Sequence, residues 1–156
     1  MSRPSMRRQD RALPPGEGWR ILAQADHGVL ATVGPGGAPY AVPLNHVLVG
    51  EVLYFHGATE GHKLDNLAGE DRVSYCAVTL AEVLPAELST RYESAIAFGR
   101  ARLVLDPGER RAALEALLGR FAPGHPEEGA EAMASWGPRT AVVRMDVDHI
   151  SAKRHS

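Results

Sequence analysis

Residues 52–67 read VLYFHGATEGHKLDNL, a stretch in which a strand pattern passes directly into a helix pattern. The run VLYFH is rich in branched and aromatic apolar residues, which is typical of a strand. Small residues follow, and leucines then recur at the spacing of one helix face. With Thr59 as the N-cap, the amides of residues 60–63 lie unpaired in the first turn. Free amides beside Lys63 are suited to holding a phosphate.

Two observations leave this phosphate interpretation open. Thr59 can equally cap an ordinary surface helix on which His62 and Lys63 are solvated. Glu60 also places a negative charge close to any bound anion, which weakens binding. Local sequence therefore makes this segment a candidate phosphate site and nothing firmer.

The strands that precede it offer a surface for a planar ring. Residues 28–33 and 38–49 read GVLATV and APYAVPLNHVLV, and the turn GPGG between them predicts a hairpin. Pro43 lacks an amide hydrogen, so its strand is expected at a sheet edge or with a ladder that another group completes. Small and apolar residues with free backbone groups suit a flat heteroaromatic ring. A ring and a phosphate together describe flavin mononucleotide, FMN.

The downstream sequence predicts more strands than helices. Residues 72–80 and 92–105 are expected to be strands separated by a loop over 81–88, and residues 139–154 form a final strand. Gly99 lies near the middle of the second of these strands and indicates a bend or bulge. With about six strands joined mostly by tight turns, a small antiparallel barrel is favoured over a parallel α/β sheet.

Helices are expected in three further places. Residues 16–26 have apolar residues at the spacing of an amphipathic helix. Residues 106–121 give the clearest helix, because Asp106 and Glu109 resemble a capping box and Pro107 suits the first turn. Residues 122–137 predict a loop that leads into a short helix.

The composition of the 156 residues is that of one ordinary globular domain, with 44% hydrophobic residues and a net charge of -2. The Arg- and Pro-rich residues 1–15 predict a flexible arm, and residues 16–156 the domain. No apolar run is long enough to span a membrane, and no secretory signal follows the basic start, so a cytoplasmic location is expected. The net charge gives no reason to expect a nucleic-acid partner. Neither the single Cys76 nor the scattered histidines form a metal-binding motif.

Taken together, YAVPLN, LYFHGATEGHKLDNL and YESAIAFGRARLV occur in an order and spacing that resemble one known family. These motifs are similar to those of FMN-binding split-barrel proteins related to pyridoxamine 5′-phosphate oxidase, most of all the nitroimidazole reductase branch. The resemblance spans about residues 19–153. It implies a mainly β fold with short helices, a six-stranded antiparallel split β-barrel, and a homodimer with cofactor sites at the subunit interface.

The resemblance also implies which residues contact FMN. It assigns the isoalloxazine ring to the strand around Pro43, the ribityl chain to the end of the next strand, and the phosphate to the helix start at Lys63. His62 is assigned to substrate contact as well, because histidine can donate a proton near neutral pH. His46 and Trp136 are further candidates for lining the pocket. The cofactor-binding candidates are Val42, Pro43, Leu44, Asn45, His56, Gly57, His62, Lys63, Tyr92 and Ser94.

The expected activity is that of an FMN-dependent oxidoreductase that reduces a small electron-poor acceptor such as a nitro-heterocycle, with a reduced nicotinamide as a candidate donor. Oxidation of pyridoxamine phosphate itself is not favoured, because the chain ends HISAKRHS without a clear arginine-rich segment. Two alternatives remain open. One is a flavin-binding or redox-sensing protein without turnover, and the other is a split barrel that binds haem or a deazaflavin.

Overall fold

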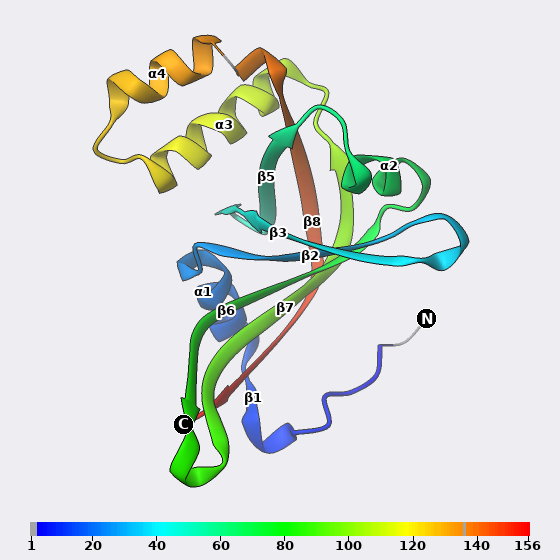
Figure 1. Cartoon of the computed structure of the whole chain (residues 1–156), viewed down its shortest axis with the longest axis vertical. Coiled ribbons are helices and arrows are strands. Elements are labelled where there is room, and N and C mark those ends of the chain that lie inside the picture. The colour runs from blue at the N-terminus through cyan, green and yellow to red at the C-terminus, as the bar shows by residue number, and fades with distance from the viewer. Residues whose placement is uncertain (1–2, 136) are drawn as a thin grey trace.

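The computed structural model describes residues 3–135 and 137–156, in which one curled antiparallel sheet is surrounded by four helices (Figure 1). The strands are β1 (Ala12–Leu13), β2 (His27–Val33), β3 (Pro39–Asn45), β4 (Val47–Val49), β5 (Val52–Ala58), β6 (Arg72–Leu84), β7 (Ser89–Leu103) and β8 (Thr140–His155). The helices are α1 (Pro15–Gln24), α2 (His62–Gly69), α3 (Pro107–Phe121) and α4 (Pro126–Ser135). The strand order is β3-β2-β6-β7-β8-β5-β4, and β1 pairs with β8 off this path.

The mainly β split-barrel class predicted from the sequence is confirmed, although eight strands form within the described residues rather than six. One extra strand is the short β1. The other arises because the strand expected over residues 38–49 breaks at His46, which turns its side chain into the core. The two ring nitrogens of His46 lie 2.6 Å from Tyr75 Oη and from the carbonyl oxygen of Leu22. These two contacts satisfy a buried polar ring that would otherwise be costly.

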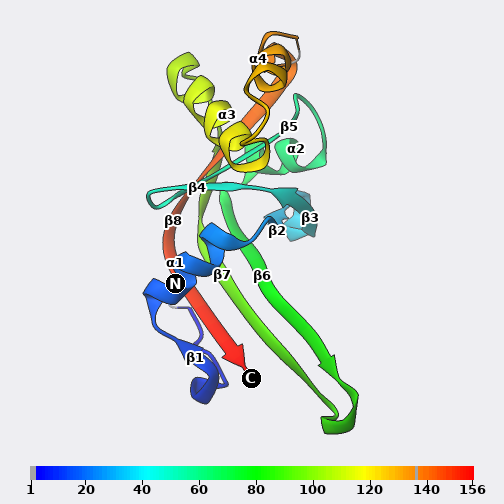
Figure 2. The same ribbon diagram turned by 90° about the vertical axis from the view of Figure 1, so that its left-hand side faces the viewer.

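Two predictions about particular strand residues are confirmed. Pro43 lies in β3, which is an edge strand of the sheet. This strand pairs with β2 on one side and has no partner strand on the other, and proline is tolerated in strands of this kind. At Gly99 the register between β7 and β8 shifts, as expected for a bulge. The loop expected over residues 81–88 is shorter, because residues 81–84 continue β6 in register with β7. The resulting hairpin extends away from the α3–α4 end of the molecule (Figure 2).

The core lies between the curled sheet and α1. Ile21 and Leu22 of α1 are fully buried, and they pack with Leu30, Phe55 and other residues that point to the concave side of the sheet. Helix α3 covers the end of the sheet near β4 and β5, where a second buried cluster includes Leu114. Apolar burial of this kind provides the main stabilising free energy of the fold.

The start of α3 follows the sequence prediction. The Asp106 side chain accepts a hydrogen bond from the amide of Glu109 at 2.8 Å, and Pro107 occupies the first helical position. The helix therefore begins where the capping residues place it. The N-terminal segment is also partly placed, since Ala12 and Leu13 pair with β8 and Arg3 lies 2.8 Å from Asp148. None of the described helices is long and apolar enough to cross a membrane.

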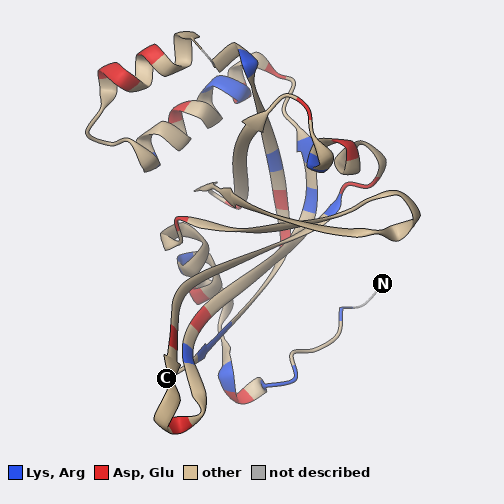
Figure 3. Ribbon diagram, viewed as in Figure 1, with Lys and Arg blue, Asp and Glu red and all other residues tan. Residues whose placement is uncertain are grey.

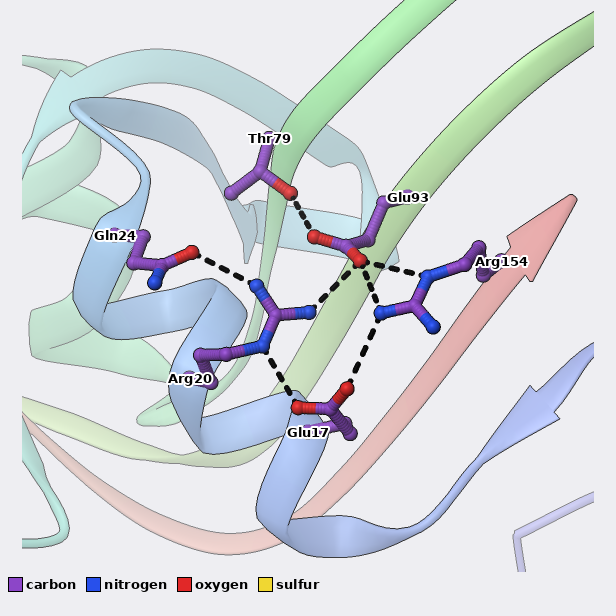
Figure 4. Close-up of polar contacts among 6 residues, drawn as sticks. All are labelled: Glu17, Arg20, Gln24, Thr79, Glu93 and Arg154. Atoms are coloured by element: carbon purple, nitrogen blue, oxygen red, sulfur yellow. Dashed lines mark hydrogen bonds and ion pairs between the residues drawn. The ribbon is translucent and has the colours of Figure 1, made fainter. Parts of the chain in front are cut away.

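A carboxylate beneath α1 ties this helix to the sheet (Figure 4). Glu93 of β7 accepts hydrogen bonds from Arg20 of α1 at 2.7 Å, from Arg154 of β8 at 2.6 Å and from Thr79 of β6 at 2.6 Å. Only 12% of its side chain is exposed. These donors, Arg20 above all, lower the pKa of Glu93 from 4.5 to about 2.

We expect this carboxylate to make the protein sensitive to acid. Because the pKa of Glu93 is lower in the folded state, the unfolded state takes up its proton first, and stability is lost as the pH falls from about 4.5 toward 2. Glu93→Gln should lower the free energy of unfolding at pH 7 by about 1.5–3 kcal/mol and flatten its dependence on pH in that window. Urea unfolding at pH 7 and at pH 3 measures both effects. Glu115→Gln, which removes an exposed partner of Arg111, should change neither.

Candidate functional site

The end of β5 brings two of the predicted cofactor residues together. His56 is half-buried, and its Nδ1 is buried without a hydrogen-bond partner among the described residues. Burial, together with the positive charge of Lys63, lowers the pKa of His56, which favours the neutral form of its ring. A buried ring nitrogen without a partner is unusual in a folded protein and suits contact with a ligand.

Gly57, the next residue, makes room for the side chain of Lys63. A Cβ atom at position 57 would lie 3.0 Å from Lys63 Nζ, tighter than an ordinary van der Waals contact. Among the described residues, no carboxylate forms an ion pair with Lys63. Its ammonium group is therefore an uncompensated positive charge at the end of β5.

Helix α2 begins later than the sequence predicts. Its N-cap is Gly61, with φ of 140° and ψ of 173°, and no side chain caps the helix. Thr59 and Glu60 lie outside the helix, so the expectation that Thr59 is the N-cap is wrong. The physical reason is the backbone at Gly61, which has a conformation that residues with a Cβ rarely adopt. The free first-turn amides start at His62 rather than at Glu60.

Asn66 anchors α2 to the sheet. Its side chain is buried and donates a hydrogen bond to the hydroxyl of Thr32 in β2 at 2.9 Å. This contact fixes the orientation of the helix start relative to the β2–β3 hairpin. The hairpin then brings Tyr40 of β3 against His62, with ring centroids 3.9 Å apart and ring planes inclined by 28°. This stacked pair was not predicted from the sequence, in which its members are far apart.

Strand β3 presents alternate residues to two different environments. Val42 and Leu44 pack against the core, whereas Pro43 and Asn45 are exposed on the outer face. Of the four predicted ring-binding residues in β3, only Pro43 and Asn45 therefore offer side chains to a ligand. The Asn45 side chain is held by a hydrogen bond from Nδ2 to the Asp26 carbonyl at 2.9 Å. Strands β2 and β3 contain no charged residue and are uniformly tan in Figure 3.

An apolar cavity of about 300 Å³ adjoins Asn45 and His56. It lies between α3, α4 and the end of β5, and no Lys, Arg, Asp or Glu side chain lines it among the described residues. The remaining lining residues are Leu114, Leu117, Leu118, Phe121, Ala132, Met133, Gly137 and Thr140. The described residues, taken as a whole, contain no group of three His, Cys, Asp or Glu side chains that could hold a metal ion.

Tyr92 and Ser94 lie far from the end of β5. His56 pairs with Val142 on β8, whereas Ser94 pairs with Lys153 on the same strand. These two β8 residues are eleven positions apart, which is about 36 Å along a strand at about 3.3 Å per residue. The Tyr92 hydroxyl instead accepts a hydrogen bond from Arg11 at 3.3 Å. Within one chain, the predicted cofactor residues therefore form two separate groups.

The other candidates have different outcomes. His46 is fully engaged in the core, where burial lowers its pKa, so it is not available to a ligand. His62 is exposed at the start of α2. Trp136 lies outside the described residues. The residues at the end of β5 fit a flavin nucleotide in two respects: the Nδ1 of His56 has no partner among the described residues, and Lys63, which forms no ion pair among them, packs its ammonium against Gly57.

The fold resembles that of several solved structures. A candidate 5-nitroimidazole antibiotic resistance protein from Bacteroides thetaiotaomicron superposes with a TM-score of 0.75 at 23% identity, covering 91% of this chain and 85% of that one. An FAD-binding protein from Mesorhizobium loti gives 0.71 at 21%, covering 94% and 98%. An FAD- and haem-binding protein from Mycobacterium smegmatis gives 0.68 at 27%, covering 87% and 68%.

The sequence itself matches a family model over nearly its whole length. Among curated proteins, none matches the chain at a significant level. The model described as pyridoxamine 5′-phosphate oxidase, in contrast, matches residues 14–154, which include all four helices, strands β2 to β7 and all of β8 but its last residue. The chain therefore belongs to the pyridoxamine 5′-phosphate oxidase-like family.

Proposed function

We propose that this protein is a flavin-dependent oxidoreductase that acts as a homodimer and reduces a small, flat, uncharged acceptor such as a nitro-heterocycle. The observation that carries the proposal is the uncharged cavity that adjoins Asn45 and His56, two of the predicted flavin contacts. A flavin would accept two electrons from a donor such as a reduced nicotinamide and pass them to the acceptor. The protein's own residues bind and orient both molecules.

The flavin nucleotide would lie along the end of β5 and the outer face of β3. Lys63 and the first-turn amides of α2 would hold phosphate, and the missing Cβ of Gly57 lets the Lys63 ammonium lie close against β5. Pro43 and Asn45, exposed on an uncharged strand, would contact the ring. FMN is the flavin expected from the sequence, and FAD is the one named for the relative from Mesorhizobium loti.

A second subunit would complete the site. Tyr92 and Ser94 are about 36 Å along β8 from the His56 group at about 3.3 Å per residue, which is longer than one flavin nucleotide. Both groups can contact the same flavin only if they come from different chains. The outer sheet face also offers a surface for a second copy, because small and apolar residues pair across it in the row Pro43, Val29, Cys76, Ile96 and Ser151.

The cavity favours an uncharged acceptor. At about 30 Å³ for each water molecule, 300 Å³ has room for about ten waters, or a ligand of about ten to fifteen non-hydrogen atoms. That size suits a substituted single ring and is too small for a flavin. An ion would lose its hydration in an apolar cavity without an opposite charge to compensate, which is costly. The neutral imidazole of His56 and the amide of Asn45 can still hydrogen-bond a nitro group or ring nitrogen.

This proposal is tested by turnover with a reduced nicotinamide and two acceptors of similar size, a neutral 5-nitroimidazole and the anion 4-nitrobenzoate. We expect turnover with the neutral compound and a much higher KM for the anion. Ala132→Phe, which places a large ring in the cavity, should raise KM for the nitroimidazole by about tenfold or more and leave flavin affinity unchanged.

Ala112→Phe is the matched control, because Ala112 is exposed on α3 and does not line the cavity. The same KM for the Ala132 and Ala112 variants would contradict the assignment of the cavity to the acceptor. Flavin binding without any turnover would favour the alternative of a flavin carrier or redox sensor.

Haem is a second candidate ligand, favoured by His56, whose Nδ1 has no partner among the described residues, and by Met133; both residues line the apolar cavity. The relative from Mycobacterium smegmatis is described as binding haem together with FAD. The cavity, at about 300 Å³, is smaller than a haem, so α4 would have to move for haem to enter. A Soret band after addition of haemin, lost in His56→Ala, would support this alternative.

A further inference from the structure

The rings of Tyr40 and His62 stack at the start of α2, where Lys63 follows His62 in the chain, and the proposed function does not use them. We propose that Tyr40, His62 and Glu60 form a subsite for the adenosine half of a dinucleotide flavin, so that the protein binds FAD in preference to FMN. This inference rests on the proposal that the protein binds a flavin at Lys63. It adds the identity of the cofactor and the residues that select it.

The ring pair has the properties of a platform for a base. The two centroids are 3.9 Å apart, so each ring covers one face of the other, and His62 remains exposed to solvent. Tyr40 is fixed within β3 by its pairing with Thr32, and α2 is fixed by Asn66, so both rings start from rigid elements. Nucleic-acid bases stack on such rings whatever their hydrogen-bonding pattern.

The position of the pair matches the chemistry of an adenosine diphosphate group. His62 and Lys63 are adjacent, so a base stacked at His62 lies close to a phosphate held at Lys63. The backbone just before His62 is open, since a Cβ atom added at Gly61 would meet nothing within 4 Å. FMN ends at its phosphate and has no group to place against the rings, whereas FAD continues through a second phosphate and ribose to adenine.

Glu60 fits a dinucleotide better than a mononucleotide. Its side chain is exposed, and it forms no hydrogen bond or ion pair among the described residues. A terminal phosphate carries a charge of about −1.5 to −2 at pH 7, so the nearby carboxylate repels it. Each phosphate of a dinucleotide carries a single negative charge, and the adenosine ribose offers hydroxyl donors. A carboxylate that accepts hydrogen bonds from ribose hydroxyls is a known way to bind dinucleotides.

The test is to titrate the purified 156-residue chain with FAD and with FMN and to measure both dissociation constants by flavin fluorescence. We expect FAD to bind more tightly, by about 5- to 150-fold, which corresponds to stacking of one base. His62→Ala and Tyr40→Leu should each remove most of this preference by weakening FAD alone. Tyr40→Phe keeps the ring and should retain the preference. Glu60→Gln should strengthen FMN binding and weaken FAD binding.

The outcomes separate this inference from the proposed function. If neither flavin binds, the proposed function fails. If both flavins bind with equal affinity, or if His62→Ala and Tyr40→Leu lower the affinity for both flavins equally, the proposed adenosine subsite is wrong. The proposal that the protein binds a flavin would not be affected by that result. Competition by adenosine diphosphate gives a second readout. Adenosine diphosphate should displace bound FAD from the wild-type protein but not from His62→Ala.

Discussion

Replacing Gly99 with Ala is expected to destabilise the protein strongly, although the substitution adds only one methyl group. A Cβ atom at this position would lie 1.9 Å from the carbonyl oxygen of Asp146 in β8. That atom belongs to the backbone of the neighbouring strand, so no side-chain rotation can relieve the clash. Either the bulge between β7 and β8 must shift or the two strands must separate.

We expect a loss of about 3 kcal/mol or more in the free energy of unfolding, the upper range for overpacking a well-packed site. This loss lowers Tm by about 6–12 °C in a domain of this size. Thermal unfolding followed by circular dichroism measures it. Gly119→Ala is the matched control, because Gly119 lies within α3 with nothing near its added Cβ and should gain up to about 1 kcal/mol. Equal Tm values for the two variants would contradict the close approach at the bulge.

Lys63→Ala is expected to have the largest effect on cofactor binding. If its ammonium group donates a charge-assisted hydrogen bond to the flavin phosphate, the loss costs about 1.5–3 kcal/mol, or roughly 10- to 150-fold in affinity. The effect should shrink at high salt, because ions screen an exposed pair. Flavin fluorescence titrations at two salt concentrations measure both.

The control for Lys63 is Arg72→Ala. Arg72 follows the other end of α2, where it pairs with Glu70, so this variant removes the same charge without touching the candidate phosphate site. The flavin affinity of Arg72→Ala should equal that of the wild-type protein. If Lys63→Ala also leaves the affinity unchanged, Lys63 does not bind the phosphate.

Much of the fold could be predicted because its signals are local. Asp106, Pro107 and Glu109 define the start of α3 within four residues, and the turn between β2 and β3 is encoded by consecutive glycines and a proline. The missing donor of Pro43 limited its strand to a sheet edge or to a ladder that another group completes, and the strand lies at the edge. Signals of this kind depend only on neighbouring residues in the sequence, so they can be interpreted without knowledge of the rest of the structure.

The errors came from contacts between distant residues. The break between β3 and β4 depends on His46 reaching Tyr75 and Leu22, and nothing near His46 in the sequence reveals these partners. The start of α2 moved from Thr59 to Gly61 because the loop before it adopts a backbone that only the three-dimensional path requires. The continuation of β6 past residue 80 likewise depends on its pairing with β7.

The candidate site shows the same division. The sequence predicted that His56, Gly57 and Lys63 act together, since they lie within one strand-to-helix segment. It did not predict the stacking of Tyr40 on His62 or the cavity beneath α4, because both require the tertiary arrangement. Nor does sequence alone indicate that Tyr92 and Ser94 of β7 pair with the end of β8 that is far from His56. Their role as cofactor contacts from a second chain stays a prediction.

The most direct test of the proposed function is whether the purified protein binds a flavin between two chains. Titration with FMN and FAD, followed by analytical ultracentrifugation at the flavin absorbance, gives the affinity, the number of flavins per chain and the mass of the complex. We predict saturable binding of one flavin per chain in a particle of two chains. A colourless protein that binds neither flavin at micromolar concentration would contradict the proposal.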